Sequence, residues 1–255
     1  MDKEKYTPAE LMVAAASREI SDGEVVFVGM RLPLLGFLLA KKLYAPNATG
    51  LYELGIVRDD AAPEPILTMG DLPNLSNATW LSSTWDMMGL LQQGCVDVSF
   101  IGGAQVDRFG NLNTSYVGDF KEPSTRLPGS GGACDLACLA RRHIIIMAHR
   151  KHRFVEKVDF ITSPGFGTGG RWRENQGLPW GGPSTVITDK GVLKFDEKTK
   201  EMTLVSLHPG VTLKEIYDST GWKLKLAPSL GETKIPSKDE LLALRIFDPH
   251  RFWTA

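Results

Sequence analysis

The sequence has few cysteines, no excess of either charge and no long apolar run. Only three of its 255 residues are cysteine, which is too few for a disulfide framework, so we expect reduced thiols. Lys and Arg number 29 against 30 Asp and Glu, so no basic field exists to attract nucleic acid or an anionic membrane. The longest apolar stretch, residues 32–40, is far shorter than the ~20 residues that span a bilayer.

The first ten residues lack the basic and then apolar segments of a secretory signal. Together with the unpaired cysteines, this predicts a cytoplasmic protein. The glycine-rich segments match neither the Gly-x-Gly-x-x-Gly pattern nor the P-loop, so a nucleotide fingerprint is absent. No repeat or break in composition marks a second domain, and we expect one domain over residues 1–255, with a peripheral hairpin and helices from residue 190.

Apolar periodicity predicts an α/β fold. Helical patterns cover residues 8–20, after Thr7 as a candidate N-cap, and residues 34–43. Short β-branched or apolar runs predict strands at residues 24–28, 51–54, 96–102, 143–148, 157–163 and 185–188. Strands that recur between helices indicate an open, mostly parallel sheet flanked by helices.

The C-terminal third has a different pattern. Residues 190–196 and 201–207 alternate around a polar turn, which predicts a hairpin and an antiparallel end to the sheet. Residues 212–220 and 237–245 each begin with Thr or Ser and carry Glu three residues later, as helices with capping boxes do.

Two glycine clusters are candidates for a binding site. Residues 101–107 include Gly102 and Gly103, and residues 128–133 include Gly131 and Gly132 before Ala133. Glycines let main-chain N–H groups approach a ligand oxygen, which suits an oxyanion hole or a phosphate cradle. Tight turns between strands and helices explain the same spacing.

Glu53 is the candidate nucleophile. It lies between apolar neighbours at the end of a predicted strand, where α/β sheets place their sites. Desolvation there would strengthen a carboxylate as a nucleophile, although a glutamate at a strand end also fits a solvent-facing or ion-paired role.

Two further pairs of residues are weaker candidates for a functional site. Cys134 and Cys138 share a predicted helix face, but no second pair of ligands at metal spacing accompanies them, so we expect structural thiols and no metal. His149 and His152 belong to a basic run that is either a solvated surface turn or a contact for the phosphate groups of a ligand.

Taken in order, several segments resemble the smaller subunits of class I CoA-transferases, of the glutaconate CoA-transferase kind, over nearly the whole chain. The resemblance rests on residues 28–29, 32–34, 43–46, 53–55, 70–72, 100–113, 118–119, 129–133, 153–154, 163–165 and 188–196. Their order makes the resemblance specific.

The resemblance implies an open α/β subunit that packs against a homologous larger subunit in a hetero-oligomer. It places Glu53 at the catalytic glutamate, which attacks an acyl-CoA and carries CoA as a glutamyl thioester to a second acid, either small or dicarboxylic. It assigns oxyanion or CoA contacts to the main chain of five residues, namely Gly102, Gly103, Gly131, Gly132 and Ala133. CoA enters as part of the substrate, and no metal or bound cofactor is implied.

One departure is Leu54, where relatives have a small or polar residue, and this leaves the choice of acid open. Two alternatives stand beside the transferase. One is an acyl-CoA hydrolase or decarboxylase on the same fold, and the other is a non-catalytic subunit for ligand binding or assembly.

Overall fold

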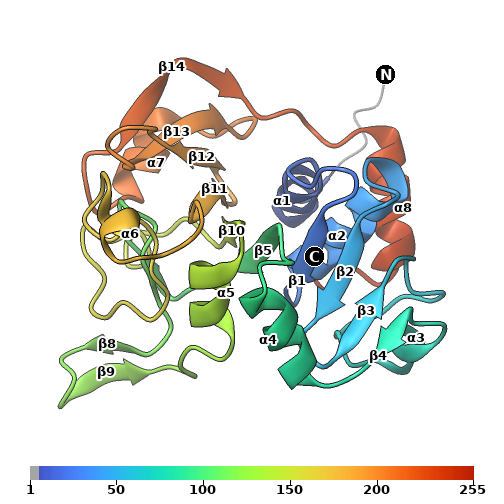
Figure 1. The fold of residues 1–255 in the computed structure, drawn as a ribbon. Helices are drawn as coiled ribbons and strands as arrows, with labels where there is room; N and C mark the ends of the chain where they lie inside the picture. Colours follow the sequence, from blue (N-terminus) through green and yellow to red (C-terminus); the bar gives the residue numbers. More distant parts are fainter. Residues whose placement is uncertain (1–5) are drawn as a thin grey trace. The chain divides into compact units, whose positions relative to one another are not determined.

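The computed structural model describes residues 6–255, which divide into two compact units (Figure 1). Unit 1 contains the chain up to Phe100 together with Lys234–Ala255, and unit 2 contains Ile101–Thr233. The C-terminal segment that sequence patterns place at the periphery is therefore shared between the two units.

Unit 1 is built on a sheet whose inner pairs are parallel. Strand β1 (Val25–Val28) pairs in parallel with β2 (Thr49–Tyr52) and with β5 (Val98–Ile101). Strands β3 (Ile56–Arg58) and β4 (Trp80–Leu81) continue the sheet beyond β2 in antiparallel order. The register aligns Val28 with Tyr52, so β1 and β2 end at the same edge of the sheet.

The helices of unit 1 begin at strong local signals. Helix α1 (Pro8–Ser17) has the expected Thr7 cap, and α8 (Lys238–Phe247) begins after Ser237, each with a complete capping box. Helix α2 (Leu32–Leu43) is apolar on almost every face and is buried over most of its length. The shorter helices of this unit are α3 (Leu72–Leu75) and α4 (Thr84–Gln92).

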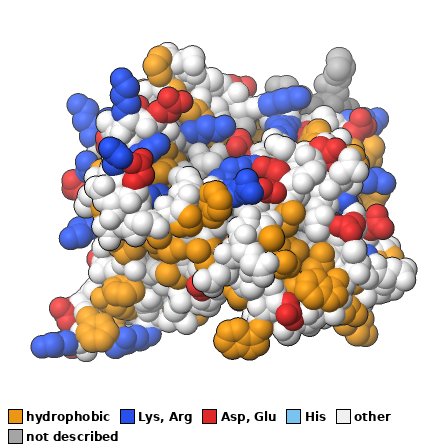
Figure 2. Space-filling model, viewed as in Figure 1, with side chains coloured by type: hydrophobic (Ala, Val, Ile, Leu, Met, Phe, Trp, Pro, Cys, Tyr) orange, Lys and Arg blue, Asp and Glu red, His pale blue; other side chains and the backbone are white. Residues whose placement is uncertain are grey.

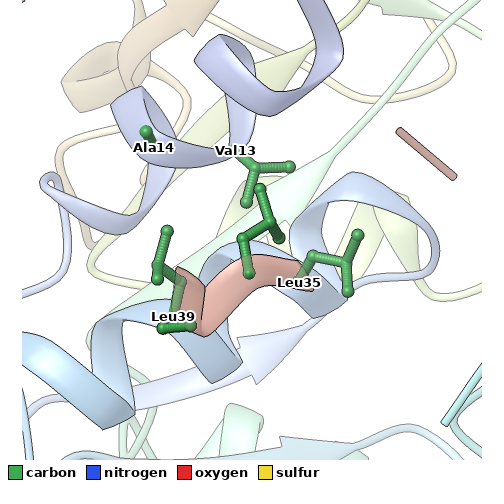
Figure 3. Packing of buried hydrophobic residues seen from close by; sticks show 6 residues of the cluster. Val13, Ala14, Leu35 and Leu39 are labelled. Carbon is green, nitrogen blue, oxygen red and sulfur yellow. The ribbon is translucent and has the colours of Figure 1, made fainter. Parts of the chain in front are cut away.

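Three helices share one apolar core in unit 1. Val13 and Ala14 of α1 belong to one cluster with Leu35 and Leu39 of α2 (Figure 3), and α8 adds two buried residues to it. The C-terminal helix therefore closes the core that the first helices begin.

Unit 2 contains the strands from β10 to β14. Strand β10 (Arg142–Ile146) pairs in parallel with β11 (Pro183–Ile187), which is followed by the antiparallel strands β12 (Gly191–Phe195) and β13 (Met202–Leu207). Strand β14 (Lys225–Glu232) pairs in parallel with β13. The expected hairpin and antiparallel strands are confirmed, and both units have the open α/β architecture that the sequence predicts.

Smaller elements complete unit 2. Two short antiparallel pairs are formed by β6 (Gln105–Val106) with β7 (Leu112–Asn113) and by β8 (Tyr116–Gly118) with β9 (Pro123–Arg126). Its helices are α5 (Ala133–Leu139), α6 (Trp172–Asn175) and α7 (Leu213–Asp218), and α7 has the expected capping box at Thr212.

The prediction of a strand at residues 157–163 is wrong. This segment forms only an isolated bridge between Ser163 and Leu112. Polar side chains replace the missing ladder, because Asp159 accepts from the Gly118 N–H and the Gln105 amide, and Thr162 accepts from the Thr114 N–H. The spacing of apolar residues predicts a strand here, but it gives no sign that polar side chains will bind the backbone N–H groups instead.

Within residues 6–255 no helix is both long enough and apolar enough to cross a membrane.

Truncation of Leu244 on α8 tests the shared core of unit 1. Leu244 is 1% exposed, whereas Leu242 on the same helix is 52% exposed. We expect Leu244→Ala to lower the free energy of unfolding by about 2–5 kcal/mol and Leu242→Ala by less than about 1 kcal/mol. Denaturant unfolding of both variants measures the difference, and equal losses would contradict the assignment of α8 to the core.

Candidate functional site

Glu53 lies in a tight turn at the carboxyl end of β2. The Gly55 N–H donates to the Tyr52 carbonyl at 2.9 Å, which closes a turn over residues 52–55 before β3 begins. Glu53 is thus the first residue after the strand and not part of it, as the predicted strand over residues 51–54 had it. The turn places the glutamate at the sheet edge where α/β folds hold ligands.

Gly55 fixes the position of this turn. Its φ of +96° is a conformation that other residues rarely adopt, and an added Cβ would lie 2.3 Å from the Ser82 carbonyl oxygen. The Ser82 N–H donates to the Gly55 carbonyl at 2.7 Å. Only glycine allows this close approach, so the turn that carries Glu53 is held against the segment before α4.

The Glu53 carboxylate is half-buried and unengaged. Within residues 6–255 it has neither a hydrogen bond nor an ion pair, which distinguishes it from Glu10 and Glu240, whose carboxylates hold Arg245 and Arg18. A nucleophilic carboxylate needs free lone pairs, and a permanent cationic partner would reduce its reactivity.

Apolar side chains are exposed around the turn in unit 1. Leu54 is 55% exposed, and a Cβ on Gly70 would lie 2.8 Å from its Cδ1, so Leu54 packs against that glycine. Exposed large side chains on the neighbouring elements are Leu72, Trp80, Leu81 and Trp85. Figure 2 shows hydrophobic side chains over the region where β3, β4 and α4 lie. Such a surface is typical of a binding face.

A buried arginine that sequence patterns did not single out organises the loop after β3. Arg58 is 2% exposed, and its guanidinium donates to the carbonyls of Asp60, Ala61, Asn74 and Ser76 at 2.8–3.2 Å. It fastens residues 60–76 to the sheet. Burial raises the pKa of neighbouring Tyr52, whose phenol is therefore neutral at physiological pH.

The first glycine cluster lies in unit 2, directly after β5. Gly102 is exposed and Gly103 is partly buried, and a Cβ on Gly103 would lie 3.0 Å from Leu112 Cδ2 and 3.1 Å from the Gln105 carbonyl. The small size of Gly103 therefore serves local packing, while the main chain at Gly102 is open to solvent.

The second glycine cluster begins α5 in unit 2. Gly131 has a φ of +48°, with nothing within 4 Å of an added Cβ. The Ala133 N–H donates to the Ser130 carbonyl at 2.9 Å, whereas the N–H groups of Gly131 and Gly132 have no partner among residues 6–255. Of the three N–H groups expected to meet an oxyanion, the two glycine groups are available.

A second buried arginine holds the other end of α5. Arg173 is 5% exposed and donates to the carbonyls of Ala137, Gly165 and Trp180 at 3.0 Å. A cation at carbonyls of the last helical turn is favourable to the helix dipole. Burial, with Arg173 nearby, lowers the pKa of His143 to about 3, so that histidine is neutral.

The loop between β6 and β7 is organised by Asp107. Its carboxylate accepts from the Phe109 N–H at 2.9 Å and from the Asn111 side chain at 2.8 Å, and Asn111 in turn holds Gly165 and Gly167. Burial raises the pKa of Asp107 to about 6 in spite of these donors.

The prediction that His149 lies on a basic surface turn is wrong. His149 is fully buried, stacks on Phe154 with ring centroids 3.8 Å apart, and contacts Thr220 Oγ1 at 3.0 Å, while His152 is exposed. Cys134 and Cys138 are partly buried free thiols. Residues 6–255 contain no group of His, Cys, Asp and Glu side chains suited to a metal ion.

Comparison with known proteins gives consistent results. A family model described as coenzyme A transferase matches residues 9–219. The chain is 39% identical over 244 residues to the B subunit of 3-oxoadipate CoA-transferase from Pseudomonas knackmussii, covering 95% of this chain and 94% of that one. It is 38% identical over 236 residues to the B subunit of glutaconate CoA-transferase from Acidaminococcus fermentans, covering 90% and 88%.

Solved structures agree. Glutaconate CoA-transferase from Acidaminococcus fermentans matches with a TM-score of 0.91 at 35% identity, over 100% of this chain and 99% of that chain. The decarboxylase AibA/AibB matches with a TM-score of 0.83 at 27% identity, over 97% of each chain. Fold and sequence together define an α/β acyl-CoA enzyme subunit. The chain belongs to the coenzyme A transferase family and is a CoA-transferase subunit of the B type.

Replacement of Gly55 tests whether the turn depends on close approach. Gly23 also has a positive φ, +80°, but nothing lies within 4 Å of an added Cβ. We expect Gly23→Ala to lower the free energy of unfolding by about 1–2 kcal/mol, through backbone strain alone. Gly55→Ala should cost about 1–3 kcal/mol more, because the new methyl overlaps Ser82. Denaturant unfolding compares them, and equal costs would contradict the close approach.

Asp107 should make stability depend on pH. Its pKa is about 6 in the folded chain against 3.8 ordinarily, so the folded state binds the extra proton between these values. The contribution of Asp107 to the free energy of unfolding therefore falls as the pH rises from about 4 to about 6, by about 3 kcal/mol in total. We expect Asp107→Asn to remove that slope when unfolding is followed from pH 4 to 7. A variant that keeps the wild-type slope would assign it to other groups.

Proposed function

We propose that Glu53 is the nucleophile of this CoA-transferase subunit. The observation that carries the proposal is its position: a half-buried carboxylate without a partner among residues 6–255, in a turn fixed by Gly55 at the carboxyl end of a parallel strand. Carboxylates that serve as structural anchors in unit 1, such as Glu10 and Glu240, are fully occupied by arginines and backbone N–H groups.

The first half-reaction transfers CoA to the enzyme. A Glu53 oxygen attacks the thioester carbonyl carbon, the C–S bond breaks, and CoA leaves as a thiolate from a mixed anhydride. The thiolate then attacks the glutamyl carbonyl, which releases the first acid as a carboxylate and leaves glutamyl-CoA. The two steps conserve the energy of the thioester, provided that water is kept from the anhydride.

The second half-reaction reverses these steps with another acid. The acceptor carboxylate attacks the glutamyl thioester and CoA leaves again as a thiolate. That thiolate attacks the acceptor carbonyl of the new anhydride, which gives the product acyl-CoA and restores the Glu53 carboxylate. No redox equivalent is consumed, so CoA thioester and free acid are the only reactants.

Main-chain donors are proposed to stabilise the oxyanion or to contact CoA. Gly131 and Gly132 are the better candidates, because their N–H groups have no hydrogen-bond partner among the described residues. Gly102 and Gly103 are weaker candidates, and the Ala133 N–H is already used. One lost oxyanion donor typically costs about 3 kcal/mol of transition-state stabilisation.

The partner and the substrates follow from the relatives. Two relatives are named as B subunits, and the decarboxylase AibA/AibB is named for two kinds of chain. The partner proposed here is therefore a homologous CoA-transferase chain of the A type, in a hetero-oligomer. The exposed apolar side chains of unit 1 support a partner chain. Glutaconate and 3-oxoadipate, named for two relatives, are dicarboxylates, which favours dicarboxylic acids here.

Trapping of the covalent intermediate tests the nucleophile. The complex with the A-type partner is incubated with acyl-CoA without acceptor, reduced with borohydride and mapped by peptide mass spectrometry. We expect an alcohol at position 53, because a glutamyl thioester is reduced and a free carboxylate is not. Glu53→Gln should lower transfer at least about 1,000-fold.

Glu64→Gln is the matched control, because Glu64 is an exposed glutamate in the same unit. It should retain wild-type transfer. An unmodified Glu53 in a complex that still consumes acyl-CoA would overturn the proposal and favour a hydrolase or a decarboxylase, in line with the similarity to AibA/AibB.

A further inference from the structure

Arg31 has an unusual backbone at the end of β1. It directly precedes α2, with φ 68° and ψ −123°. These angles are those of the first central residue of a type II′ turn, a position dominated by glycine, and an arginine there is strained. Strain of this kind persists where the surroundings impose it, and it concentrates at functional sites.

The Arg31 guanidinium also lacks an ionic partner. Unit 1 has five arginines, and three of them, Arg18, Arg58 and Arg245, are held by carboxylates or backbone carbonyls. Arg31 is exposed, and within residues 6–255 it contacts no carboxylate; it lies 4.9 Å from the centre of the Trp253 ring. A guanidinium stacked on an aromatic ring keeps its donors free for an anion.

Trp253 is a firmly anchored platform. Asp248 is 2% exposed and accepts from the N–H groups of Phe252, Trp253 and Thr254 at 2.7–3.1 Å, which fixes the C-terminal turn. The Trp253 indole N–H donates to the Leu67 carbonyl at 3.0 Å. The ring under Arg31 is therefore tied to the loop that contains Leu67.

The same loop contacts the turn that carries Glu53. The Asp71 carboxylate accepts from the N–H groups of Leu67 and Thr68 at 2.7 and 3.0 Å, which closes the loop around Gly70. Leu54, next to the proposed nucleophile, packs against Gly70. Since β1 and β2 are parallel and in register, Arg31 and Glu53 both follow strands that end at one edge of the sheet.

We propose that Arg31 is the specificity-determining residue that binds the second carboxylate of a dicarboxylic substrate while Glu53 attacks or receives the other end. The proposal rests on the transferase function proposed above and adds the group that recognises the acid. The planar guanidinium suits bidentate binding of a carboxylate, and Leu54 supplies apolar surface for the hydrocarbon between the two ends.

Acceptor selectivity tests the proposal in the complex with the A-type partner. With acetyl-CoA as donor, kcat/KM is measured for glutarate and for pentanoate, which lacks the second carboxylate. Arg31→Gln should lower kcat/KM for glutarate about 100-fold, as expected for loss of a charge-assisted bidentate contact, and change that for pentanoate less than about twofold. Arg31→Lys should recover part of the glutarate activity.

Lys42→Gln is the matched control, because Lys42 is an exposed cation near the far end of α2, about 16 Å along its axis at 1.5 Å per residue. It should leave both acids unchanged. Arg31→Gly fits the strained backbone, so its Tm should be no lower than that of the wild type while glutarate selectivity is lost. This separates recognition from folding.

Equal losses for both acids, or no loss for glutarate, in the Arg31 variants would overturn the role of Arg31 while leaving Glu53 as nucleophile. A wild-type complex that transfers CoA to neither acid and forms no adduct at Glu53 would overturn both proposals.

Discussion

The parallel pairing of β1 with β2 is the constraint on which the candidate site in unit 1 depends. Because Val28 and Tyr52 are in register, both strands end together, and the residues that follow are delivered to one edge of the sheet. Polar groups can be exposed there without disturbing the apolar contact between α2 and β2, where the rings of Phe37 and Tyr52 meet edge to face at 6.3 Å. The rigid sheet positions the turns, and in α/β folds such turns carry the residues that bind ligands.

Two buried arginines extend this order into the loops. Arg58 and Arg173 are each satisfied mainly by backbone carbonyls, so each fastens several irregular segments at once. Burial lowers the pKa of Arg173, and burial, with the Arg173 charge nearby, lowers the pKa of His143 and keeps it neutral. Irregular backbone is thereby made rigid without occupying a carboxylate.

Sequence patterns predicted the regular parts of both units well. The capped helices after Thr7, Thr212 and Ser237 form as expected, because their signals act within four residues. The β12–β13 hairpin does too. The arginine anchors could not be foreseen, since their partners are carbonyls up to 36 residues away and carry no side-chain signature. His149 was misjudged for a related reason: a charged run gives no sign of one member turning inward to stack on Phe154.

Two residues of unit 1 have local features that the fold itself does not require, and these two are the proposed functional residues. Many of its positions agree at every level: the core shared by α1, α2 and α8 is apolar and buried, α1 and α8 begin with capping boxes, and Arg18 and Arg245 hold carboxylates. Glu53 and Arg31 depart from this agreement. One is a partly buried carboxylate without a partner among the described residues, and the other is an arginine in a backbone conformation that favours glycine.

Such departures persist when the surrounding structure fixes them and a ligand uses them. Gly55 fixes the turn of Glu53 against Ser82, and Trp253, held by Asp248 and Leu67, supports the side chain of Arg31. The proposed dicarboxylic substrate needs an anionic group that accepts its acyl end and a cationic group that binds its other carboxylate. Glu53 and Arg31 each lack an internal ionic partner among the described residues, so both would be available to such a substrate.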